Sequence, residues 1–293
     1  MRNIFIKELI KKAELNKNII LMVGDLGFNV VEPFKQKFPN RFINAGVSEQ
    51  NMASMAAGLA IKGFHVFIYS IANFPTFRCA EQIRNDIDYH NLPVTIVTVG
   101  SGVGYGNLGY SHHGIQDYGL MRLFKNISIC SPIDIEELKG CMDFLITKPH
   151  PSYLRLEKSD EITVTKKFKK KIPGSTYLVK KKNTSNVIIS TGSVFKKVSK
   201  LMRKNKYKNF SHFTIPIWGQ NYKKNVFKNI KKFKNIITVE DHLVDGGFGS
   251  WLNECGFNKP NIKYKIKSIF INKSVIGKVG DKEFLEKKHY SKI

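Results

Sequence analysis

The sequence predicts an α/β protein with two domains, each built on a mainly parallel sheet flanked by helices. Short apolar runs typical of buried strands alternate with segments of helical spacing, which is the pattern of βαβ units. The length of 293 residues fits about two domains. A lysine-rich stretch with a Pro-Gly pair interrupts the pattern near its middle. We therefore expect domains at residues 1–160 and 183–293, joined by a connection at residues 161–182.

The first domain contains most of the expected elements. Apolar runs predict five strands, at residues 18–23, 41–44, 65–69, 94–99 and 127–130. Helical spacing predicts four helices, at residues 1–15, 48–61, 77–88 and 133–145. Ser48 is placed to cap the second helix and Gly63 to end it.

The second domain shows the same kind of alternation without a sequence repeat. Three apolar runs predict strands, at residues 187–190, 212–215 and 236–239. Residues 194–204 predict a helix, and the glycine-rich run 246–250 opens another that continues through Trp251. Both halves therefore fit an α/β architecture.

Composition excludes several classes of protein. The net charge is +25, of which residues 151–293 contribute +23, mostly as lysine; only seven arginines occur in the chain. Lysine is a solvated point charge and a weaker reader of bases and phosphates than arginine, so we do not expect a nucleic-acid partner. No apolar stretch reaches the ~20 residues of a membrane span. The four cysteines are far apart, which argues against a metal site or disulfides and indicates a cytoplasmic protein.

Three features of the sequence follow predicted strands, where open parallel sheets bind ligands. The first is Glu49, in the first turn of a helix, where the helix dipole favours a carboxylate. A glutamate at a helix start is also common without any function. The second is a set of apolar residues in steps of three, Ile71, Phe74 and Phe77, which would line a pocket for a flat ring or belong to the core.

The third feature is a glycine-rich loop at residues 100–114 that ends in His112 and His113. Glycine lets backbone approach a ligand closely, and histidine can move protons near neutral pH. An exposed histidine pair without function is the other interpretation. The position of the pair, at the end of a loop that follows a strand, keeps both interpretations open.

Taken in order, these segments resemble the transketolase family. NAGVSEQNMASMAAGLAIKG, AEQIRNDI, SHHGIQD, ICSPID and SYLRLEK are similar to the transketolase pyrimidine-binding domain. STGS, TVEDHLVDGGFGS and the closing residues 280–290 are similar to the transketolase C-terminal domain. The resemblance spans nearly the whole chain and matches the separate C-terminal subunit of split transketolases, which are transferases of aldehyde or ketone residues.

The resemblance implies thiamine diphosphate with Mg²⁺ as the cofactor, and it assigns roles to the residues above. Glu49 matches the glutamate that hydrogen-bonds N1′ of the aminopyrimidine, so that the 4′ nitrogen can take the proton from the thiazolium C2. Phe74 matches the aromatic residue that stacks on the pyrimidine, with Ile71 and Phe77 beside it. His112 matches the loop histidine that faces the substrate.

The positions expected to meet the substrate depart from the family pattern. Asp25 matches a conserved turn near the entrance, and His113 lies next to His112. The others differ from the family: Asn29, Gly100, Leu108 and Lys158 replace a serine, a histidine, an aspartate and an arginine. These changes disfavour the usual pentose phosphates and suggest an unusual acceptor, such as an activated sugar. The resemblance also leaves open a 2-oxo acid donor, as in deoxyxylulose-phosphate synthase or 2-oxoacid dehydrogenase β subunits.

The expected partner follows from what the sequence lacks. The family holds the diphosphate and Mg²⁺ with a Gly-Asp-Gly motif in an N-terminal domain, and Gly24-Asp25 is followed by Leu26 here. We therefore expect no metal ligands on this chain. We expect a partner, an N-terminal transketolase subunit that carries the diphosphate site, in an α2β2 assembly with the cofactor between chains.

Overall fold

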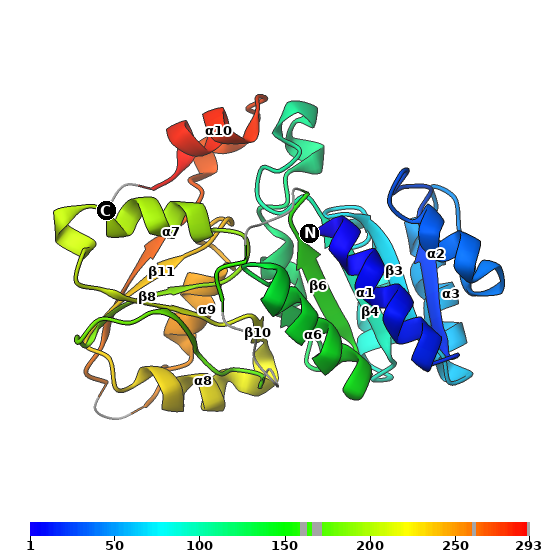
Figure 1. Ribbon diagram of the computed structural model, residues 1–293, viewed down its shortest axis with the longest axis horizontal. Coiled ribbons are helices and arrows are strands. Elements are labelled where there is room, and N and C mark those ends of the chain that lie inside the picture. Colours follow the sequence, from blue (N-terminus) through cyan, green and yellow to red (C-terminus); the bar gives the residue numbers. More distant parts are fainter. Residues whose placement is uncertain (159–162, 166–171, 260–261, 292–293) are drawn as a thin grey trace.

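A computed structural model shows two sheets side by side, with helices packed on both (Figure 1). It describes residues 1–158, 163–165, 172–259 and 262–291. Both sheets are mainly parallel, which confirms the predicted fold class. The predicted domain limits stay a prediction, and the connection expected at residues 161–182 lies partly outside the described residues.

The first sheet has seven strands in the order β10-β5-β6-β4-β3-β1-β2. Six are parallel: β1 (Ile19–Val23), β2 (Phe42–Asn44), β3 (His65–Ile71), β4 (Val94–Val99), β5 (Ser128–Cys130) and β6 (Ser152–Leu156). The seventh strand, β10 (Ile217–Trp218), pairs antiparallel with β5 although it comes from the second half of the chain. The two halves are therefore joined through a sheet edge.

The second sheet has five strands in the order β12-β11-β8-β9-β7. Their bounds are β7 (Tyr177–Lys180), β8 (Asn186–Ser190), β9 (Ser211–Thr214), β11 (Asn235–Val239) and β12 (Lys265–Ile269). All neighbours are parallel except β7, an edge strand antiparallel to β9. The carboxyl ends of the parallel strands share one edge of the sheet.

Ten α-helices are found among the described residues. They are α1 (Arg2–Leu15), α2 (Glu32–Lys37), α3 (Glu49–Ile61), α4 (Ala80–Gln82), α5 (Asp117–Met121), α6 (Ile135–Thr147), α7 (Phe195–Met202), α8 (Lys223–Ile230), α9 (Phe248–Glu254) and α10 (Lys282–His289). Alternate residues of β1 enter two cores: Ile20 and Met22 pack with α3, while Leu21 packs with α1 and α6. None of the helices in the described parts of the chain is long and apolar enough to cross a bilayer.

Two local expectations are corrected by the structure. Residues 77–88 form a 3₁₀ turn, the short α4 and a π-helix at residues 83–88, where the sequence predicted one regular helix. Ser48 stands at the N-cap of α3, but its hydroxyl donates to the Ala45 carbonyl at 2.6 Å and caps no helix amide. Gly63 follows α3 with φ +93°, which confirms it as the helix stop.

Two buried histidines make the fold sensitive to acid. Burial lowers the pKa of His65 and of His212 to about 3. The folded state therefore binds fewer protons than the unfolded state between pH 6.5 and about 3. The free energy of unfolding should fall as the pH drops through this window, by up to about 1.4 kcal/mol per pH unit for each histidine. Urea titrations at pH 7.5, 6 and 5 measure the slope.

Two variants test whether His212 contributes to this dependence of the free energy of unfolding on pH. His212 Nε2 lies 2.8 Å from the Ser190 hydroxyl, and His212→Gln keeps a polar group there without the titration. We expect the slope to be smaller in His212→Gln and unchanged in the exposed control His90→Gln. An equal slope in His212→Gln and the wild type would contradict this assignment.

Candidate active site at the carboxyl edge of the first sheet

The site predicted from the sequence lies where β1, β3 and β4 end. These three strands are parallel neighbours, so their carboxyl ends lie along one edge. Glu49 follows β2, Phe74 follows β3, and the glycine-rich loop, residues 100–114, follows β4. The topology therefore brings together segments that are separated by some 25 residues each in the sequence.

Glu49 is the first residue of α3 and is 1% exposed. Its Oε2 accepts a hydrogen bond from Arg78 Nη1 at 2.6 Å. The helix N-terminus and the guanidinium both place positive charge at the carboxylate. Gly24 lies beside the other oxygen, and a Cβ added there would be 3.6 Å from Oε1. Glycine at this position thus leaves space next to the carboxylate.

A chain of ring contacts leads from Arg78 to the glycine-rich loop. The Arg78 guanidinium lies 4.8 Å from the centroid of the Phe74 ring. The His112 and Phe74 rings lie edge to face, with their centroids 5.1 Å apart. Glu49, Phe74 and His112 are therefore connected through contacts, and their belonging to one functional site stays a prediction. Arg78 was missed, because Phe74 lies in the turn before the helical segment and no helical spacing links the two residues.

The same chain of contacts continues to Lys158. The centroids of the His112 and Tyr105 rings are 6.5 Å apart, and Lys158 Nζ lies 4.9 Å from the Tyr105 centroid. Burial raises the pKa of Tyr105, while nearby Arg2, which also hydrogen-bonds it, lowers it. Lys158 is exposed and Arg2 is half-buried, so two cations lie at this end of the site. No local pattern points to Arg2, because it lies about 100 residues from the loop.

His113 differs from His112 in its surroundings. His113 is 1% exposed, and neither ring nitrogen has a hydrogen-bond partner among the described residues. Its carbonyl accepts from Asn73 Nδ2 at 2.9 Å, and Asn73 Oδ1 is also buried and without a partner in the described chain. Burial lowers the pKa of both His112 and His113. Unsatisfied polar atoms beside Phe74 fit a site that another molecule completes.

The other predicted residues surround this centre with fewer contacts. Asp25, at φ +54°, accepts from Asn44 Nδ2 at 2.8 Å, so Asn44 ties the ends of β1 and β2 together. Asn29 is exposed at φ +62°. Ile71 ends β3 and is half-buried. Phe77 and Leu108 are 46% and 55% exposed.

A buried ion network contacts the end of the glycine-rich loop; its charged residues lie in sequence segments quoted above, but the sequence did not predict their contact. Arg155, on β6, donates from Nε to Asp117 and from Nη1 to Asp241, at 2.6 and 2.5 Å. Its Nη2 donates to the carbonyl of Gly114, the last residue of the glycine-rich loop, at 2.5 Å. All three charged side chains are at most 2% exposed. Arg155 thus joins the loop, α5 and the end of β11.

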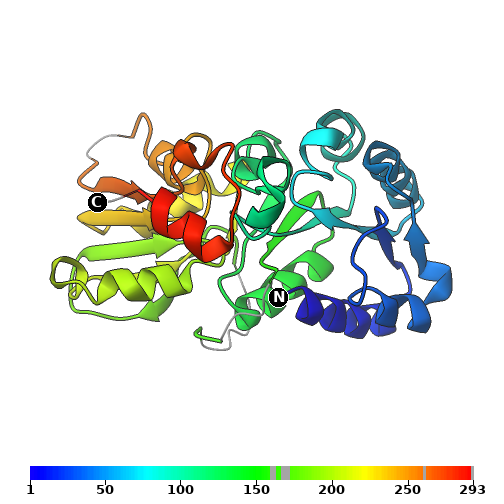
Figure 2. The same cartoon turned by 90° about the horizontal axis from the view of Figure 1, so that it is seen from above.

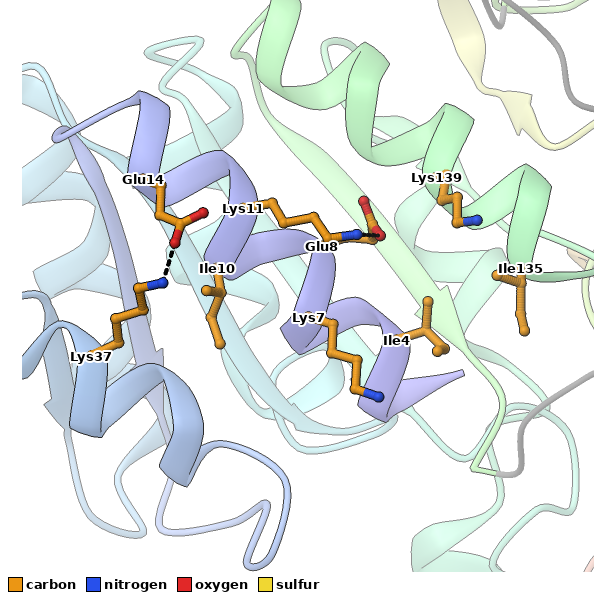
Figure 3. Close-up of a pocket in the computed structure, with 9 residues that line it drawn as sticks. All are labelled: Ile4, Lys7, Glu8, Ile10, Lys11, Glu14, Lys37, Ile135 and Lys139. Atoms are coloured by element: carbon orange, nitrogen blue, oxygen red, sulfur yellow. Dashed lines mark hydrogen bonds and ion pairs between the residues drawn. The ribbon is translucent and has the colours of Figure 1, made fainter.

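Two surface grooves lie away from this site. The larger, of about 510 Å³, runs between α1, α2 and α6 (Figure 3). Two of its lysines pair with glutamates that also line it: Lys11 Nζ lies 2.7 Å from Glu8 Oε1, and Lys37 pairs with Glu14. The smaller, of about 320 Å³, lies between β7 and α7. Among the described residues, no group of three or more His, Cys, Asp or Glu side chains is placed to hold a metal ion.

Comparison with known proteins identifies relatives over most of the chain. Residues 1–161 match the family "Transketolase, pyrimidine binding domain". The chain is 28% identical to an apulose-4-phosphate transketolase subunit of Actinobacillus succinogenes, over 87% of this chain and 82% of that protein. It is 31% identical to the "Putative transketolase C-terminal section" of Methanocaldococcus jannaschii, over 92% and 87%.

Two further matches extend the comparison. The 1-deoxy-D-xylulose-5-phosphate synthase of Corynebacterium diphtheriae is 27% identical over 91% of this chain, which spans 43% of that enzyme. A solved structure described as "Split gene transketolase, inactive beta4 tetramer" superposes with a TM-score of 0.81 over 98% of this chain and 92% of that one, at 24% identity, and shows the same fold. The chain therefore belongs to the transketolase family and contains its pyrimidine-binding domain.

Proposed function

We propose that this chain is the C-terminal subunit of a thiamine-diphosphate-dependent transferase that moves a two-carbon ketol unit between sugar-type substrates. The observation that carries the proposal is the buried carboxylate of Glu49 at the start of α3, linked through Arg78 and Phe74 to His112. Relatives named as a transketolase subunit and as a transketolase C-terminal section support a divided enzyme.

The residues present fit the aminopyrimidine end of this cofactor. The carboxyl edge of the first sheet carries the buried carboxylate of Glu49 and the aromatic ring of Phe74. It also carries polar atoms of His113 and Asn73 that have no hydrogen-bond partner among the described residues. Thiamine diphosphate, when bound, supplies a thiazolium carbon that becomes a nucleophile. Glu49 would hold a proton at the ring nitrogen N1′, and Phe74, with Ile71 and Phe77 beside it, would pack on the ring.

The loop and the cationic end of the site would bind the substrate. His112, whose pKa burial lowers, would be neutral near pH 7 and able to accept a proton from a substrate hydroxyl. Lys158 lies against Tyr105 and would attract an anionic group without the bidentate geometry of arginine. Asp25, Asn29, Leu108 and His113 would line the remaining substrate space.

The diphosphate end requires a second chain. The sequence contains no Gly-Asp-Gly motif, so we assign the diphosphate and Mg²⁺ to an N-terminal transketolase subunit in an α2β2 assembly. This chain alone should show no thiamine-dependent turnover, and mixing it with that subunit should produce turnover and a larger species in gel filtration. Robust turnover by the isolated chain would contradict the divided enzyme.

The donor distinguishes the proposal from its alternative. Similarity to 1-deoxy-D-xylulose-5-phosphate synthase favours a 2-oxo acid donor as the second candidate. The reconstituted pair should consume a ketose donor without releasing CO2. Pyruvate consumption with CO2 release would instead support the alternative.

A further inference from the structure

The end of the chain packs against the loop that carries His112. The C-terminal segment, residues 271–290, includes α10, which lies beside the green-cyan segment that follows β4 in both views (Figures 1 and 2). The Gly280 amide donates to the Gly106 carbonyl at 3.2 Å. A Cβ on Gly106 would lie 2.6 Å from Leu285 Cδ1 and even closer to the Gly280 carbonyl oxygen. The two segments are therefore in tight backbone contact.

An apolar cluster and an ion pair hold this contact. The cluster joins Val103 of the loop and Ile115, which directly follows it, to four residues from the second half of the chain: Leu243, Ile271, Val275 and Leu285. Lys282, at the start of α10, pairs with Glu157, which is 2% exposed. Burial lowers and the Glu157 carboxylate raises the pKa of Lys282, with a net upward shift.

Glu157 connects that ion pair to both sides of the proposed substrate site. Its Oε1 accepts from the Lys158 amide at 2.7 Å. A Cβ on Gly104 would lie 3.1 Å from the same oxygen, so the carboxylate lies directly against the loop. The Lys282–Glu157 ion pair therefore connects α10 both to the backbone of Lys158 and to the loop that contains His112.

We propose that the C-terminal segment is a clamp that positions His112 and Lys158, with the Lys282–Glu157 ion pair as its fastening contact. The effect of the clamp on substrate binding by His112 and Lys158 rests on the proposed function. The clamp itself is a property of this chain alone. Without Lys282, the buried carboxylate has no cation in this contact, and the glycine-rich loop opens more often.

Hydrogen–deuterium exchange on the full isolated chain tests the clamp. Lys282→Met should accelerate exchange of the Gly106, Leu108 and His112 amides about tenfold, while amides of β4 and β8 stay at wild-type rates. Lys282→Arg should restore slow exchange in the loop. Lys287→Met is the matched control, because Lys287 is an exposed lysine of the same helix, and it should change nothing.

Two results would overturn the clamp: loop exchange within twofold of wild type in Lys282→Met, or an equal acceleration in β4 and β8, which would indicate general destabilisation. In the reconstituted enzyme, Lys282→Met should lower kcat while the KM for thiamine diphosphate stays constant. Absence of any thiamine-dependent turnover in the wild type would refute the proposed function, and the exchange data would still decide on the clamp.

Discussion

Glu49→Gln, assembled with its partner subunit, should lose about 10³-fold or more in kcat while folding normally. The amide has nearly the shape of the carboxylate and its oxygen can still accept the Arg78 hydrogen bond, so packing beside Gly24 is preserved. It cannot exchange a proton with a ring nitrogen, and proton transfer by a positioned side chain typically contributes about 10²–10⁴-fold. Steady-state kinetics with saturating thiamine diphosphate measure the loss.

A matched substitution separates this effect from a general loss of charge. Glu81→Gln removes an exposed carboxylate just after the Phe74–Arg78 segment and should leave kcat within twofold. Thermal unfolding of both variants checks that each is folded. A Glu49→Gln enzyme with more than a tenth of the wild-type kcat would remove Glu49 from the proposed mechanism.

Arg155→Met should be the most destabilising single change in the site region. It leaves the carboxylates of Asp117 and Asp241 buried without their cation and frees the Gly114 carbonyl. Breaking a buried pair by removing one partner typically costs about 3–5 kcal/mol. At this chain length that corresponds to a fall in Tm of roughly 10 °C, measurable by calorimetry.

Neutralising the stranded carboxylates should recover much of this loss. In Arg155→Met with Asp117→Asn and Asp241→Asn, no buried charge of the network remains, and we expect Tm to rise again. Arg84→Met, at an exposed arginine, is the control and should stay within about 0.5 kcal/mol of wild type. A Tm for Arg155→Met equal to that of the control would contradict the role of the network.

The fold was predictable where a buried strand is also apolar in sequence; β6 was missed although all 5 of its residues are buried, because Ser152 and Arg155 interrupt its apolar run. The runs that became β1 and β4 are apolar throughout, or nearly so, since both faces of a central parallel strand are covered. β12 was missed because it is an edge strand with exposed lysines, and β10 because two residues give no periodicity. Residues 77–88 depart from the regular helix that was predicted. At the end of this segment, the Asp88 carboxylate accepts hydrogen bonds from the backbone amides of Lys125 and Asn126, a contact that the local sequence does not indicate.

The residues of the candidate site that belong to local sequence motifs could be predicted from the sequence. Glu49, Phe74 and His112 each follow a strand, and the parallel topology places them together. Arg2 and Lys282 lie near the ends of the chain, so only the folded structure shows them beside Tyr105 and Glu157. The link from Arg155 to Asp241 crosses between the two sheets and likewise has no local signal. The roles of all these residues stay proposals.

The most direct measurement is a structure of this chain bound to its partner subunit and thiamine diphosphate. The account predicts that a Glu49 carboxylate oxygen lies within hydrogen-bonding distance, about 2.6–3.2 Å, of N1′ of the aminopyrimidine. It also predicts that the diphosphate contacts the other polypeptide. A structure with Glu49 still paired only to Arg78, and with the pyrimidine elsewhere, would contradict the central claim.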